Sequence, residues 1–80
     1  MTENEIEKKI NDVLMGRADE LVIHTMGGDD FTLYEREIGN YELKPMGHPQ
    51  SRPWYGEVVC WSLQVEGLPY PVYFTDIETR

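Results

Sequence analysis

The chain has 80 residues, with 15 Asp or Glu and seven Lys or Arg, so its net charge is −8. This length corresponds to one domain whose single core is only just large enough to fold. Its 40% hydrophobic and 11% aromatic content is ordinary for a folded protein. A net charge of this size repels nucleic acid and anionic membranes, which argues against either as a direct partner.

The negative charge is concentrated in the first half of the chain. Residues 1–42 hold eleven acidic and four basic residues, a balance of −7, whereas residues 43–80 hold four and three, a balance of −1. Net charge governs solubility and the steering of partners rather than the fold. The asymmetry therefore predicts a partner that carries positive charge.

Cysteine usage and hydropathy indicate the compartment. Cys60 is the only cysteine, which excludes a disulfide within the chain and favours a reducing environment. The sequence lacks the basic segment and apolar stretch of a signal peptide, and no apolar run approaches the roughly 20 residues of a membrane span. We expect one cytoplasmic domain that comprises residues 1–80.

Residues 3–15 have the periodicity of an amphipathic helix. Thr2 followed by Glu5 is a capping-box pattern at its start, and Gly16 stands where a residue with positive φ commonly ends a helix. The apolar stripe, spaced i, i+4, i+7 and i+8, consists of Ile6, Ile10, Val13 and Leu14.

Two consecutive hairpins are predicted after the helix. Residues 21–26 are rich in β-branched side chains and lead through the turn cluster 27–30 into residues 31–38, which alternate in polarity. The glycine and asparagine that follow are a candidate two-residue turn into a strand at 41–44. We expect this second hairpin to follow directly from the first.

The second half of the chain contains one long loop and two further strands. Prolines break the periodicity over residues 45–56, alternation returns over 57–65, and a turn leads into 68–77. Pro69 and Pro71 lie two apart, so their missing N–H donors face the same side of the last strand. This spacing predicts an edge position for that strand, or at least for its first half.

The order of the elements predicts an α+β fold. An N-terminal amphipathic helix is expected to pack on one face of an antiparallel β-sheet, a meander of about five strands. The expected core consists of Ile6, Ile10, Val13, Leu14, Leu21, Ile23, Phe31, Leu33, Leu43, Val59, Trp61, Leu63, Val72 and Phe74.

The sequence contains no pattern typical of a catalytic or metal site. Cys60, His24 and His48 have no catalytic signature around them, and one cysteine with two distant histidines is not a zinc-site spacing. We therefore predict that the chain is not an enzyme and that it uses no metal and no cofactor.

Two pairs of carboxylates are candidates for acid–base chemistry. Glu35 with Glu37, and Asp76 with Glu78, are two apart on predicted strands, which places both members of a pair on one face. A solvated sheet face explains such pairs without catalysis, because a catalytic site needs convergent groups of several kinds.

The loop at 45–56 is a candidate contact surface. Arg52, Trp54 and Tyr55 are of types enriched at binding hot spots, and prolines reduce the entropy lost when such a segment is ordered. Large side chains of a loop also commonly cap an open end of a core. Capping is the favoured interpretation for Trp54, and both interpretations stay open for Arg52 and Tyr55.

The leading functional hypothesis is a non-enzymatic protein–protein interaction module, an inhibitor or modulator of a more basic partner protein, with self-association as a further expectation. A second hypothesis is a nucleic-acid mimic that blocks a DNA- or RNA-handling protein, because acids spaced along a helix and a strand can resemble a phosphate backbone. A third is a small-ligand module or minor enzyme. The predicted partner-binding residues are Asp19, Glu20, Asp29, Asp30, Glu35, Glu37, Glu42, Arg52, Trp54 and Tyr55.

Local structure accounts for part of this acidity. Glutamates in the first turns of a helix are stabilised by its dipole, and Asp29 and Asp30 suit a turn. The acidic residues left without such a reason are Asp19, Glu20, Glu35, Glu37 and Glu42.

Overall fold

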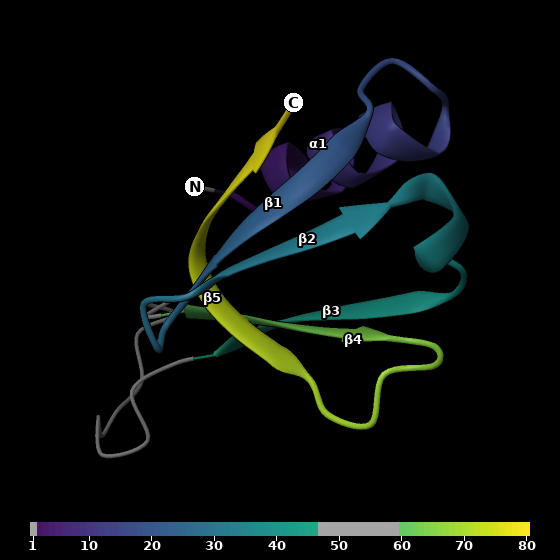
Figure 1. The fold of residues 1–80 in the computed structure, drawn as a ribbon. Helices are drawn as coiled ribbons and strands as arrows, with labels where there is room; N and C mark the ends of the chain where they lie inside the picture. Colours follow the sequence, from purple (N-terminus) through teal and green to yellow (C-terminus); the bar gives the residue numbers. More distant parts are fainter. Residues whose placement is uncertain (1, 47–59) are drawn as a thin grey trace.

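The structure is a computed structural model that describes residues 2–46 and 60–80. It consists of one N-terminal helix packed on a five-stranded antiparallel sheet, which confirms the predicted α+β fold (Figure 1). No helix in this part of the chain is long and apolar enough to cross a membrane. In chain order the elements are α1 (Glu3–Leu14), β1 (Glu20–Thr25), β2 (Asp30–Tyr34), the 3₁₀ helix η1 (Glu35–Glu37), β3 (Tyr41–Met46), β4 (Cys60–Val65) and β5 (Val72–Thr79).

Helix α1 begins and ends as its sequence predicts. The Thr2 hydroxyl accepts a hydrogen bond from the Glu5 N–H at 3.2 Å, so it satisfies one of the free donors of the first turn. Gly16 follows the helix with a φ of 77°, a conformation that glycine adopts without steric cost. Lys9 ties the helix to the sheet by donating from Nζ to the Ile77 carbonyl at 2.9 Å.

The sheet differs from the predicted meander at one connection. Its strand order is β2-β1-β5-β4-β3, so the pairs β1/β2, β3/β4 and β4/β5 are neighbours as expected. Strands β2 and β3 are not neighbours, which makes the predicted second hairpin wrong. The first and last strands, β1 and β5, pair with each other instead. The sheet is therefore strongly curved and has its two open edges at β2 and β3 (Figure 1).

Residues 34–38 explain why β2 does not turn back into β3. The Glu37 carboxylate accepts a hydrogen bond from the Tyr34 N–H at 3.1 Å, and the Ile38 N–H donates to the Tyr34 carbonyl at 3.2 Å. These bonds end the strand at Tyr34 and wind the chain into η1. The Ile38 side chain then enters the core, where it is 5% exposed. Burial of Ile38 thus outweighs the alternating pattern that predicted a strand to residue 38.

Strand β5 is central in the strand order, so the prediction that the whole strand is an edge is wrong. Its residues Val72–Phe74 pair with β4 on one side, and its residues from Phe74 to Thr79 pair with β1 on the other. Pro69 and Pro71 precede its first residue, Val72, so their missing N–H groups do not interrupt a ladder. The register with β1 shifts between His24 and Thr25, and this irregularity accompanies the bend of β5 seen in Figure 1.

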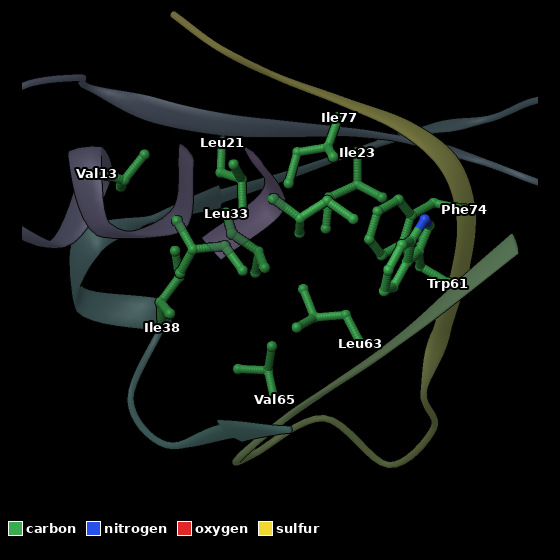
Figure 2. Close-up of a cluster of buried hydrophobic side chains, with 12 residues drawn as sticks. Val13, Leu21, Ile23, Leu33, Ile38, Trp61, Leu63, Val65, Phe74 and Ile77 are labelled. Carbon is green, nitrogen blue, oxygen red and sulfur yellow. The ribbon is translucent and has the colours of Figure 1, made fainter. Parts of the chain in front are cut away.

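The core lies between α1 and the inner face of the curved sheet. Figure 2 shows its side chains converging from the helix, from all but one of the strands and from the segment after η1. Predicted core residues Leu14, Phe31, Leu43 and Val72 are only partly buried, and Val59 lies outside the described residues. The buried hydrophobic residues are Ile6, Ile10, Val13, Leu21, Val22, Ile23, Leu33, Ile38, Trp61, Leu63, Val65, Phe74 and Ile77.

The buried position of Ile38 gives a test of this architecture. Ile38→Ala should lower the free energy of unfolding by about 2–5 kcal/mol, because it removes buried methyl groups and leaves a cavity. The matched control is Met15→Ala at a site that is 70% exposed, where the change should stay within about 0.5 kcal/mol. Urea unfolding followed by circular dichroism measures both. Equal, small effects of the two substitutions would contradict the placement of Ile38.

Candidate interaction surface

The outer face of the sheet, opposite α1, carries most of the polar side chains of the strands. Strand alternation directs Leu21 and Ile23 inward and leaves Val22 and His24 on the outer face. Val22 is nevertheless only 1% exposed. The outer face over β1 is therefore well covered by its neighbours, and His24 lies in a chain of charged side chains there.

His24 bridges two carboxylates across three strands. Its Nδ1 lies 2.7 Å from the Asp30 Oδ1 on β2, and its Nε2 lies 3.1 Å from the Glu78 Oε1 on β5. Arg80 donates to the same Glu78 oxygen at 2.8 Å. Ionised carboxylates only accept hydrogen bonds, and only the charged imidazole can donate from both ring nitrogens, so the two carboxylates favour the charged form of His24. We call Asp30, His24, Glu78 and Arg80 the histidine bridge.

The pKa values within the histidine bridge shift in the directions that hold it together. The hydrogen bond that His24 donates to Asp30 is the main cause that raises the pKa of His24 above its ordinary 6.5, with a smaller contribution from Glu78. The hydrogen bond from Arg80 is the main cause that lowers the pKa of Glu78. These charged side chains pair with one another, and the histidine bridge links β2, β1 and β5.

The raised pKa of His24 can be measured directly. Titration of its ring protons by NMR should give a pKa above 6.5, which Asp30→Asn lowers more than Glu78→Gln does, since Asp30 makes the larger contribution. A group whose pKa is higher in the folded state stabilises the protein below its unfolded pKa. That stabilisation should disappear as the pH rises through the folded pKa, and His24→Gln should abolish this pH dependence. A larger effect of Glu78→Gln would contradict the assignment.

A second group of charges gathers at the start of β1 and the end of β2. Asp19 and Glu20 are positioned by their backbone N–H groups, which donate to the Arg80 carbonyl at 2.7 and 2.9 Å. Glu20 lies opposite Tyr34 in the β1/β2 register. Asp19, Tyr34, Glu35 and Arg36 line a surface depression of about 380 Å³. We call Asp19, Glu20, Tyr34 and Glu35 the acidic patch.

Tyr34 is the component of the acidic patch that the sequence-based list of contact residues missed. Its side chain is 45% exposed although the residue is large and apolar. The signal that could have identified it is strand alternation, because Leu33 next to it is buried and Tyr34 must then face outward. Two backbone hydrogen bonds fix its position: the Tyr34 N–H donates to the Glu37 carboxylate, and the Tyr34 carbonyl accepts from the Ile38 N–H.

The other predicted contact residues have diverse roles. Asp30 belongs to the histidine bridge, Glu37 ends β2, and the Glu42 carboxylate lies 3.3 Å from Lys44 Nζ. Asp29 forms part of the turn, since its carbonyl accepts from the Thr25 N–H at 3.0 Å. Three further candidates, Arg52, Trp54 and Tyr55, lie outside the described residues, as does His48.

The predicted carboxylate pairs do not form convergent sites within residues 2–46 and 60–80. Glu35 and Glu37 lie on η1 and not on a strand, so the regular strand spacing expected of them is wrong. Asp76 accepts a hydrogen bond from the Ile77 N–H at 2.9 Å, and Glu78 belongs to the histidine bridge. In the same residues no group of three or more His, Cys, Asp or Glu side chains is arranged to hold a metal ion.

Another depression lies at the opposite end of β1 and β2. It has a volume of about 420 Å³ and is bounded by the β1–β2 turn and the start of β5. The described residues that line it include Met26, Phe31 and Tyr73 together with Asp29 and Asp30. No His, Lys or Cys is among these described lining residues, so they do not combine the several kinds of group that a catalytic site brings together.

Comparisons with protein-family models, with curated proteins and with solved structures found no match to this chain.

Proposed function

We propose that the chain is a non-enzymatic interaction module that engages a basic protein partner through the acidic patch. One observation supports this proposal. The acidic side chains of Asp19, Glu20 and Glu35 lie next to the exposed aromatic side chain of Tyr34. An aromatic anchor with charged neighbours is the common composition of a binding hot spot.

The carboxylates of the acidic patch differ from most others in having no structural task. Among the described residues, the side chains of Asp19, Glu20 and Glu35 make no hydrogen bond and no ion pair. Asp12, by contrast, pairs with Arg17 at 3.0 Å, and Glu66 accepts from Asn40 at 3.0 Å. Arg36 shares the depression with Asp19 and Glu35. The hydrogen bond to Glu78 is the main cause that raises the pKa of Arg80, and Glu20 lies close enough to add to this rise. A cationic partner would relieve the repulsion that these two cations leave uncompensated.

The geometry of the acidic patch also favours rapid binding with a small loss of conformational entropy. The backbone of Tyr34 is already fixed at the end of β2, so little conformational entropy is lost when its ring is covered. A net charge of −8 with its excess on this half of the chain accelerates encounter with a cationic surface. Arg36 at the rim of the depression adds a single positive charge that can select among partner surfaces.

The proposal is tested by removing the patch charges without changing the fold. In an affinity purification from the native host, the amount of partner retained by the triple variant D19N/E20Q/E35Q should be lower than that retained by the unaltered chain by about tenfold or more. Retention by the unaltered chain should itself decrease between low and moderate salt, because the attraction is electrostatic.

The matched control is E3Q/E5Q/E66Q, which removes the same number of charges from α1 and the β4–β5 turn. It should retain the partner as the unaltered chain does. An equal loss in both triple variants would mean that net charge alone is responsible. Absence of any retained partner at either salt concentration would remove the support for the proposal.

A further inference from the structure

Among residues 2–46 and 60–80, no strand pairs with the outer side of β3, and one hydrogen bond shows which backbone groups of β3 face this open edge. The Glu66 N–H donates to the Asn40 carbonyl at 3.0 Å, so this pair is of the hydrogen-bonded type. Backbone groups alternate sides along a strand, and the β3/β4 register is continuous from Tyr41 to Met46. The N–H and C=O groups of Tyr41 and Leu43 therefore point away from β4, toward the open edge.

The missing N–H of Pro45 falls on the same side. Pro45 is paired with Trp61 in register, and its backbone alternates with those of Tyr41 and Leu43. Its ring therefore removes a donor from the open edge and none from the ladder with β4, which is the usual place for a proline in a sheet. The edge offers both groups of Tyr41, both groups of Leu43 and the Pro45 carbonyl.

The other open edge, at β2, is partly closed. The outward N–H of Tyr34 donates to Glu37 and its carbonyl accepts from Ile38, so neither group is available. Near the other end of β2, Asp30 places a charged side chain in the histidine bridge. Among the described residues β3 is thus the longer edge with free backbone groups.

The charges on β3 are complementary to those of a second β3 in one antiparallel register. If two copies pair about a two-fold axis at Leu43, then Glu42 of each copy lies opposite Lys44 of the other. The Leu43 pair is of the hydrogen-bonded type in this register. The Glu42–Lys44 pairs are then of the non-hydrogen-bonded type, in which side chains are closer.

We propose that a second copy of this chain adds to β3 in this register and forms a symmetric dimer with a continuous sheet. Glu42 and Lys44 are 64% and 63% exposed as side chains, and their contact within one chain is a surface ion pair, so both are free to pair across the interface. Each Tyr41 meets Pro45 of the second copy, where the proline carbonyl accepts one hydrogen bond.

This interface is small, and the dimer is accordingly weak and dependent on concentration. One six-residue strand and its side chains form the contact, which belongs to the small, transient class of interfaces. The inference goes beyond the proposed function and does not rest on it, because β3 and β2 are opposite edges of the sheet. The acidic patch contains no residue of β3, so a failure of the acidic patch to bind a partner would leave this proposal unaffected.

Charge reversal at Glu42 and Lys44 tests the register. Sedimentation equilibrium over a range of concentrations should show that E42K weakens dimerisation by about tenfold or more, since it replaces two attractive cross-strand pairs by repulsive ones. E42K also makes the chain less negative, so simple relief of charge repulsion predicts the opposite result. K44E should weaken the dimer as well, and the exchange variant E42K/K44E should restore it at unchanged net charge.

Amide hydrogen exchange supplies the second measurement. Protection of the Leu43 and Tyr41 amides should increase with protein concentration. The Glu42 and Lys44 amides face β4 and should not change. A chain that stays monomeric at all concentrations, or an exchange variant that does not recover dimerisation, would overturn the proposal. If the Leu43 amide became protected only when a peptide is added, and not when the protein concentration rises, the occupant of the β3 edge would be another strand. That result would also overturn the dimer proposal.

Discussion

The pairing of β1 with β5 is the interaction on which the rest of the structure depends. It joins the start and the end of the chain, and reciprocal backbone hydrogen bonds between Glu20 and Arg80 extend it beyond the strands, with N···O distances of 2.9 and 3.0 Å. Because β5 also pairs with β4, it connects the two halves of the sheet and curves it around one core. Ile23 and Ile77 meet in the interior through this register.

The same pairing organises the outer surface. It places Glu78 beside His24, so the histidine bridge spans strands from both ends of the chain. It also draws Asp19 and Glu20 against the Arg80 backbone, which positions two members of the acidic patch. One long-range contact thus determines both where charges neutralise each other and where they remain uncompensated.

Acidity in this chain has at least two physical roles. Some carboxylates complete local structure: Glu37 ends β2, Asp76 accepts from the following backbone N–H, and Asp30 raises the pKa of His24 through a hydrogen bond. Others, in the acidic patch, make no hydrogen bond or close ion pair among the described residues, although Glu20 is attracted by Arg80. A carboxylate that completes local structure acts through one hydrogen bond, whereas the acidic patch acts through the summed electric field of several carboxylates.

Local order was readable from the sequence because it depends on near neighbours. The spacing of Ile6, Ile10 and Val13 located α1, the glycine-rich turn located the β1–β2 hairpin, and alternation in residues 61–65 identified the inner face of β4. Each of these features arises from the period of a helix or a strand, which a short segment displays by itself.

Only the tertiary structure decided how the strands close into a sheet. The local alternation of residues does not distinguish a β2/β3 hairpin from a 3₁₀ turn that buries Ile38. The prolines before β5 predicted an edge strand, whereas β5 is the central strand of the sheet. Convergence of Glu35 and Tyr34 with Asp19 was equally hidden, because it follows from the β1/β2 register and the turn at η1. Sequence determined the elements and their buried faces, since these depend on neighbours a few residues apart. The fold decided the order of strands and the grouping of charges, since these depend on contacts between distant segments.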